Sequence, residues 1–261
     1  MNQPLAYVHP GAKIAKNVVI EPFATIHNNV IIGEGTWIGS NVSIMEGARI
    51  GKNCSIFPGA VISATPQDLK YDGEETIVEI GDHTTIRECA TINKGTADRQ
   101  KTVIGKHCLI MAYCHVAHDC IVGDYCVFSN NTTLAGHVTV GDYVVLAGMV
   151  AVQQFVSVGS HAFVTGGSLV RKDVPPFVKG GREPMSYVGI NSVGLRRRGF
   201  STDKIREIQN IYRILYQMNY NTSQAAQILE AEMEATPERD EILQFIRDSQ
   251  RGIMKGYFSN N

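Results

Sequence analysis

The sequence predicts a parallel β-solenoid followed by a small helical domain. An aliphatic side chain recurs at every sixth position through most of the chain up to Val170. A small side chain follows four residues after each of them, Pro66 being the one exception, and glycine and asparagine gather in the turns between. A fixed short period of this length indicates a repeat architecture. Beyond the period, polar capping residues precede segments with a helical pattern.

The six-residue period has three runs. They extend from Val8 to Ile62, from Ile80 to Ile92 and from Ile104 to Val170. Side chains two positions apart share one face of a strand, so each small residue and the aliphatic residue after it point inward. The other positions form an outward residue and a turn, where Gly and Asn tolerate positive φ best. Three such units make one triangular coil, and stacked coils pair as parallel strands about 4.8 Å apart.

Five of the six cysteines follow the same period. Cys54, Cys108, Cys114, Cys120 and Cys126 occupy the small inward position. We expect them to be reduced core residues, because free cysteine is commonly buried. Cys108 and Cys126 lie on adjacent coils, near enough in principle for a disulfide. The solenoid already holds them together, so no disulfide is needed.

The composition narrows the range of functions. A net charge of −1 and a pI near 6.7 provide no basic field, so we expect no nucleic-acid partner. The start "MNQPLAYVHP" lacks the pattern of a signal peptide, and we find no stretch of transmembrane length. Together with the reduced cysteines, this predicts a cytoplasmic protein without an integral membrane segment.

Two polar insertions interrupt the period, at residues 63–76 and 96–102. A solenoid tolerates insertions at its corners, where an extruded loop can lean over a neighbouring surface, and function tends to lie there. The period stops at Pro175 and Pro176. We therefore expect a solenoid domain over residues 1–187 and a helical domain over 188–261. Its helices are predicted to begin at the N-caps Ser201, Thr222 and Thr236, the last followed by Pro237.

The period also predicts which outward residues stack. His118 occupies a turn, and the residues above it on successive coils are Gly136, Gln154 and Lys172. The neighbouring column contains Asp119, His137 and Phe155. A histidine beside a carboxylate, below a glycine whose N–H can be approached closely, suits acyl transfer. His115 faces outward as a supporting group or an intersubunit contact, and the remaining histidines (His9, His27, His83, His107 and His161) are expected to be solvated.

Several motifs go beyond the repeat: "HVAHDC", "NNTTLAGHVTVGD", "DVPPF", "GLRRRGF" and the loop "PQDLKY". Over essentially its whole length the chain resembles the UDP-N-acetylglucosamine O-acyltransferases, cytoplasmic hexapeptide-repeat enzymes that begin lipid A biosynthesis. The resemblance implies a left-handed parallel β-helix that assembles as a homotrimer. It also implies transfer of an (R)-3-hydroxyacyl chain from acyl carrier protein to the 3-hydroxyl of UDP-N-acetylglucosamine. No cofactor and no metal are expected.

The resemblance assigns roles to individual residues. His118 would be the general base, Asp119 would orient its ring, and Gly136 would donate a backbone N–H to the thioester oxyanion. Substrate contacts would come from His137 and Gln154, and from Gln67, Asp68 and Lys70 of a neighbouring subunit. Asn191 and Arg198 would hold UDP, with Arg197 in the same basic run. Gly166, stacked over Gly148, would act as a ruler that admits a long acyl chain.

One departure and two rival functions remain open. Relatives commonly have a histidine in the "AVQQF" region, where this chain has Gln153, and glutamine cannot transfer a proton at neutral pH. The repeats alone fit other acyltransferases of this class. A zinc enzyme of the gamma-type carbonic anhydrase kind would need a histidine spacing that His115 and His118 do not have. A non-catalytic binding repeat would expose a ladder of like side chains, whereas the outward columns here are mixed.

Overall fold

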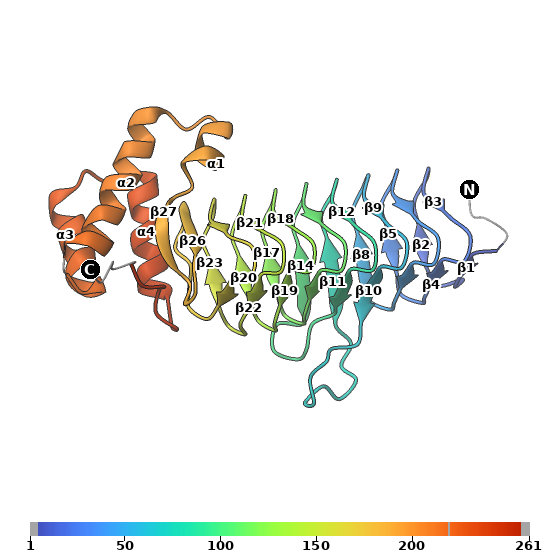
Figure 1. Cartoon of the computed structure of the whole chain (residues 1–261). Coiled ribbons are helices and arrows are strands. Elements are labelled where there is room, and N and C mark those ends of the chain that lie inside the picture. Colours follow the sequence, from blue (N-terminus) through green and yellow to red (C-terminus); the bar gives the residue numbers. More distant parts are fainter. Residues whose placement is uncertain (1–4, 219, 257–261) are drawn as a thin grey trace.

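The chain folds into a triangular prism of stacked coils with a helical domain at its C-terminal end (Figure 1). The computed structural model describes residues 5–218 and 220–256. Three sheets of nine, eight and ten strands form the sides of the prism. From β1 to β22, each strand pairs with the strand three elements further along the chain, as the period predicts.

The strands of each side are as follows. Sheet 1 contains β1 (Tyr7–Val8), β4 (Thr25–Ile26), β7 (Ser43–Ile44), β10 (Val61–Ala64), β13 (Thr91–Asn93), β16 (His115–Val116), β19 (Thr133–Leu134), β22 (Ala151–Val152) and β25 (Leu169–Val170). Sheet 2 contains β2 (Lys13–Ile14), β5 (Ile31–Ile32), β8 (Ala48–Ile50), β11 (Ile77–Ile80), β14 (Lys101–Ile104), β17 (Ile121–Val122), β20 (Thr139–Val140) and β23 (Ser157–Val158). Sheet 3 contains β3 (Val19–Ile20), β6 (Trp37–Ile38), β9 (Ser55–Ile56), β12 (Thr85–Ile86), β15 (Leu109–Ile110), β18 (Val127–Phe128), β21 (Val145–Leu146), β24 (Phe163–Val164), β26 (Val178–Gly181) and β27 (Ser186–Ile190).

The core is the inward column of each side. Every aliphatic residue of the period from Ile20 to Val170 is buried, while Val8 and Ile14 of the first coil are half-buried. The five cysteines predicted to lie inside are buried, and all six cysteines are free thiols. The core prediction is therefore confirmed.

The turns correct one part of the sequence interpretation. Positive φ occurs directly before the inward small residue, and most of these positions carry asparagine or a larger side chain, such as Asn53, His107 and Tyr125. The glycines that follow the aliphatic residues serve close packing instead. A Cβ on Gly81 would lie 2.7 Å from the carbonyl carbon of Gly105 on the next coil. Only glycine fits there, because real Cβ contacts are longer.

The helical domain contains α1 (Ser192–Arg197), α2 (Thr202–Gln217), α3 (Thr222–Glu232) and α4 (Pro237–Asp248). The predicted N-caps Ser201 and Thr236 are confirmed, since their side chains accept from the N–H groups of Lys204 and Arg239. The predicted cap Thr222 is wrong by one residue. Asn221 caps α3 through a reciprocal pair of hydrogen bonds with Gln224, a capping box that places Thr222 inside the helix.

The junction between the two parts is a β-hairpin. β26 extends sheet 3 by parallel pairing with β24, and β27 returns antiparallel to β26. β27 therefore crosses the expected boundary between residues 187 and 188, and the division into domains there stays a prediction. Within the described part of the chain, none of the helices is both long enough and apolar enough to cross a membrane.

Both insertions leave the prism at the same corner and project from it (Figure 1). The first connects β10 to β11 and the second connects β13 to β14. The second ends at residue 100 and not at the predicted 102, because Lys101 and Thr102 pair with β11 as part of β14. It therefore lies on the coil directly before that of "HVAHDC", and the first insertion lies one coil earlier.

Candidate active site

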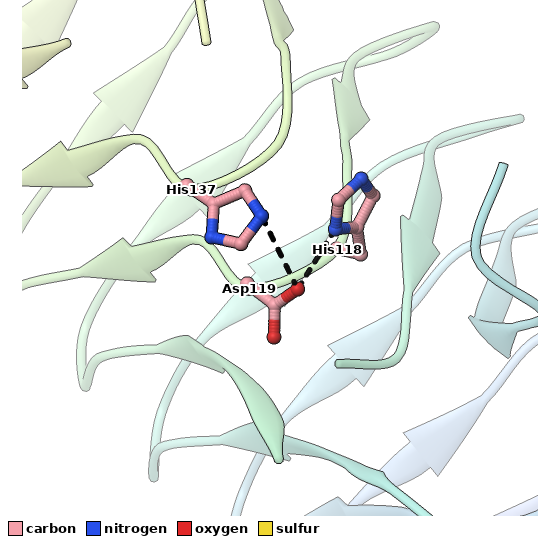
Figure 2. A group of neighbouring side chains, drawn as sticks. All are labelled: His118, Asp119 and His137. Carbon is pink, nitrogen blue, oxygen red and sulfur yellow. Dashed lines mark hydrogen bonds and ion pairs between the residues drawn. The ribbon is translucent and has the colours of Figure 1, made fainter. Parts of the chain in front are cut away.

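The predicted pair of columns comes together at one turn of the prism (Figure 2). His118 and Asp119 connect β16 to β17, and His137 occupies the corresponding turn one coil further on. The three residues are 6%, 0% and 8% exposed. His118 was expected to point outward from the prism, and its ring is nevertheless buried, with Gly136 packed against its edge.

His118 and Asp119 form a direct pair. Nδ1 of His118 lies 2.8 Å from Oδ2 of Asp119. Because an ionised carboxylate only accepts hydrogen bonds, Nδ1 carries the proton and donates it. Nε2 is then the unprotonated nitrogen and is available as a base.

Gly136 lies directly over the free edge of that ring. A Cβ at this position would be 2.6 Å from both Cε1 and Nε2 of His118, so a larger residue would displace the imidazole. Within the described part of the chain the Gly136 N–H donates to no acceptor, although its neighbours on both sides donate to the adjacent coils. The base and a backbone donor therefore lie side by side.

Asp119 is held from the second insertion. Its Oδ1 accepts from the N–H groups of Thr96 at 2.9 Å and Arg99 at 3.2 Å, and its Oδ2 accepts from Thr96 Oγ1 at 2.7 Å. Burial raises the pKa of the Asp119 carboxyl. The hydrogen bonds from Thr96 and His118 more than offset this effect, so that the pKa lies below its ordinary value. The carboxylate stays ionised although it is fully buried.

His137 faces two carboxylates. Its Nε2 is 3.7 Å from Asp119 Oδ2, and its Nδ1 is 3.1 Å from Oδ2 of Asp98, without the angle of a hydrogen bond. The ring stacks on Phe155 at 4.6 Å and meets His118 edge-on at 5.1 Å. Burial lowers the pKa of His137, and the charge of Asp119 raises it in part.

Three other predicted residues, His115, Gln153 and Gln154, are more exposed than the central trio. His115 is half-buried, with its Nδ1 2.7 Å from Oγ1 of Thr91. Burial lowers its pKa, and the nearby His118 adds to the effect, which favours a neutral supporting ring. Gln154 and Gln153 are both exposed at the turn above Gly136. They can offer hydrogen bonds to a ligand on the prism surface.

The three central side chains also have potential as metal ligands. His118, Asp119 and His137 bring three ligand atoms within 4.8 Å of one another. This trio differs from the pair His115 and His118 that the sequence offered for zinc. Both oxygens of Asp119 already accept hydrogen bonds from Thr96. A bound cation would therefore compete with an existing set of donors, and metal analysis of the purified protein tests this alternative.

A second group lies at the junction with the helical domain. Arg197, Arg198 and Asn191 line a cavity of about 600 Å³ together with Lys179, a residue that sequence analysis missed. Its lining contains three cations and no carboxylate, which suits an anionic ligand. Lys179 falls beyond the end of the period, so the repeat gives no signal for it.

Asn191 and Arg198 are anchored within the chain. The Asn191 side chain accepts from Gly194 N–H at 3.2 Å and donates to the His161 carbonyl at 2.9 Å, so its amide is largely committed to capping α1. Arg198 donates to the Tyr143 carbonyl at 2.8 Å and lies 5.2 Å from the centre of that ring. His161, expected to be solvated, is half-buried instead, and its pKa is lowered to about 4 by burial and by Arg198.

The remaining predicted residues lie apart from His118. Gln67, Asp68 and Lys70 belong to the first insertion, which points away from the prism of its own chain (Figure 1). Gln67 and Lys70 are exposed, and Asp68 accepts from the Lys70 N–H at 3.0 Å. Gly166 does stack over Gly148, since a Cβ on Gly166 would be 3.0 Å from the Gly148 carbonyl oxygen.

Fold and site together define an acyltransferase of the hexapeptide-repeat class. Residues 29–64 and 101–136 match the family described as bacterial transferase hexapeptide (six repeats), and residues 173–254 match Udp N-acetylglucosamine O-acyltransferase, domain 2. The acyl-[acyl-carrier-protein]–UDP-N-acetylglucosamine O-acyltransferase of Chlorobaculum parvum is 56% identical over 193 residues, 74% of this chain and 73% of that protein. The chain belongs to the UDP-N-acetylglucosamine O-acyltransferase family.

Other relatives and solved structures agree. The enzyme of the same name from Aquifex aeolicus is 53% identical over 196 residues, 75% of both chains. A UDP-N-acetylglucosamine acyltransferase from Bacteroides fragilis superimposes with a TM-score of 0.96 at 49% identity, over 98% of this chain and all of that one. The enzyme from Francisella novicida gives the same score at 40% identity, with 100% and 95% covered. The expected left-handed β-helix is thereby confirmed.

Proposed function

We propose that this protein transfers an (R)-3-hydroxyacyl chain from acyl carrier protein to the 3-hydroxyl of UDP-N-acetylglucosamine, the first step of lipid A biosynthesis. Family membership supports the reaction. The observation that supports assigning the reaction to particular residues is the buried His118–Asp119 pair, with the N–H of Gly136 beside it. A base with a fixed tautomer next to a backbone donor is the minimum that acyl transfer requires.

In this mechanism, Nε2 of His118 takes the proton of the sugar hydroxyl as the oxygen attacks the thioester carbonyl carbon. The new C–O bond forms, and the carbonyl oxygen becomes an oxyanion that accepts from Gly136 N–H. The C–S bond then breaks, the carbonyl re-forms, and the imidazolium returns its proton to the departing thiolate. Asp119 holds the ring throughout and stabilises its cationic form. The products are the sugar ester and the free thiol of the carrier.

The direct test is incubation with acyl carrier thioester and UDP-N-acetylglucosamine. We expect equal amounts of acylated sugar nucleotide and free carrier thiol. Release of thiol without sugar ester would indicate a thioesterase and count against the proposal. Carbon dioxide hydration that depends on bound zinc would favour the rival zinc enzyme.

The cavity at the junction is proposed to hold the diphosphate of UDP through Arg198, Arg197 and Lys179. Replacing Lys179 by Met should raise KM for UDP-N-acetylglucosamine about tenfold, because one hydrogen bond to a charged group is lost. The kcat should change little, since the diphosphate does not react. Lys179→Arg keeps the charge and serves as the matched control. Unchanged KM in Lys179→Met would remove this residue from the site.

We also propose a homotrimer in which the first insertion of one subunit completes the site of the next. The support is that the insertion carrying Lys70 projects from its own prism (Figure 1). Co-refolding His118→Ala with Lys70→Ala should restore about a quarter of the wild-type activity, because random mixing leaves that share of sites intact. A mixture as inactive as its parts would show that both residues serve one chain.

Two further assignments complete the proposal. We place the enzyme in the cytoplasm, because five buried free thiols fit a reducing compartment. We also divide the chain functionally near residue 187, with acyl transfer on the β-helix and nucleotide binding shared with the helical part.

A further inference from the structure

The second insertion, between β13 and β14, makes direct hydrogen bonds to Asp119 of the candidate active site. Thr96 is 8% exposed, and both its N–H and its hydroxyl donate to Asp119. Arg99 donates its N–H to the same carboxylate, and its Nη1 donates to the Asp119 carbonyl at 2.9 Å. Four hydrogen bonds from one short segment of the chain therefore converge on a single residue.

These contacts are not needed to hold the β-helix together. The N–H of Asp119 already donates to Thr102 Oγ1 at 2.9 Å, and Ile121 pairs with Val103 and Thr139 in the sheet. Most turns of the prism have no inserted segment across them. The segment instead contacts Asp119, a buried carboxylate that stays ionised.

Asp98, between Thr96 and Arg99, reaches the other histidine. Its Oδ2 lies 3.1 Å from Nδ1 of His137, a buried nitrogen that has no hydrogen-bond partner in the described part of the chain. The Asp98 side chain is 66% exposed, so it can rotate without a large rearrangement. A small rotation would turn the close approach into a hydrogen bond.

We infer that the segment Thr96–Arg99 is a positioning clamp, in which Thr96 and Arg99 fix Asp119, and thereby His118, while Asp98 orients the ring of His137. The inference rests on the proposed acyl transfer for its kinetic readouts. Thr96, Asp98 and Arg99 touch no reacting atom, so they act through the histidines.

The electrostatic surroundings of Asp119 support this role. His118, His137 and Arg99 all approach Asp119, Asp98 faces His137, and the Cys120 thiol is the next titratable group along the chain. Burial alone would raise the pKa of Asp119, and the donors of Thr96 and His118, together with the charge of His137, lower it. Loss of the Thr96 hydroxyl should therefore raise that pKa. A carboxylate that protonates at higher pH loses its hold on His118 sooner as the pH falls.

The test compares Thr96→Val with Thr96→Ser. Valine keeps the shape and removes one donor to a charged group, so kcat should fall about 10- to 100-fold with little change in KM. The acid limb of the kcat/KM profile should move to higher pH. Serine restores the hydroxyl and should recover most of the loss. Lys101→Met is the matched control just beyond this segment, at the start of β14, because Lys101 pairs with Glu79 on the surface and does not touch Asp119.

Asp98→Asn tests the second arm. Its carboxylate is largely exposed, so the effect of its charge is screened by salt, and we expect a loss of about two- to fivefold at low ionic strength that shrinks at high salt. A loss that is independent of salt would point to shape and would contradict the electrostatic role.

A measurement without turnover separates this inference from the proposed reaction. Nitrogen-15 NMR of histidine-labelled protein reports the tautomer of His118, which should be protonated at Nδ1 in the wild type and mixed in Thr96→Val. Equal spectra and equal pH profiles for these two proteins would overturn the clamp. Equal losses in the valine and serine variants would overturn it as well, because a purely structural role does not distinguish the hydroxyl.

Discussion

His118→Ala should lower kcat by about 10²- to 10⁴-fold, the usual contribution of a positioned general base. The variant should keep its fold, since the ring lies on an outer turn and the inward residues on either side, Val116 and Cys120, are unchanged. KM for the sugar nucleotide should change far less than kcat, because a proton acceptor acts chiefly in the transition state.

The matched control is His107→Ala. His107 occupies a corresponding turn, is exposed, and stacks between His83 and Tyr125 at 4.8 Å from each. It lies outside the candidate site, so its loss should leave the rate near that of the wild type. Near-normal turnover in His118→Ala would remove the base assignment and leave the Gly136 donor as the main contributor.

The second large effect concerns acyl-chain length. Gly166 and Gly148 stack on successive coils, and Gly166 is exposed on the prism surface. Both glycines lie at turns from sheet 3 to sheet 1, whereas His118 lies at a turn from sheet 1 to sheet 2. The acyl chain therefore passes them if it runs in the groove between subunits of the proposed trimer, and a methionine at position 166 would then block its far end. Losing contacts of about three methylenes at ~0.8 kcal/mol each should lower kcat/KM for a long donor roughly 50-fold.

A graded series sharpens this test. Gly166→Ala adds a Cβ that meets the Gly148 carbonyl oxygen at 3.0 Å, a tight contact that should reduce the longest donors only slightly. Gly166→Met should shift the preference to short donors while their rates stay near those of the wild type. The same length preference in all three proteins would show that Gly166 serves only the turn.

The period predicted the parts of the structure that repeat. Because every coil has the same geometry, the spacing alone placed His118 below Gly136 and His137 above Asp119. The same rule placed the five cysteines in the core. What it did not predict was burial at this turn, where Gly136 packs against His118 and the second insertion donates to Asp119.

Contacts from outside the period required the structure. The period includes Thr96, four residues after Ile92, but does not reveal its bonds to Asp119, and Asp98 and Arg99 follow no pattern. Lys179 lies after the last repeat, where spacing no longer fixes which residues meet. The α3 cap was missed for a local reason, because Asn221 and Thr222 are both good capping residues and the partner Gln224 decides between them.

The half-buried first coil has a consequence for how the molecule unfolds. In a linear array each coil is stabilised mainly by its immediate neighbours, so opening begins at the less protected end and spreads inward. Among the described residues, the hairpin and the helices cover the C-terminal end, whereas the coil of Val8 and Ile14 pairs on one side only. Fraying should therefore start at the N-terminal coil. The β16 strand beside His118 is the sixth of nine in its sheet, so several coils can open and close before the disturbance reaches the active turn.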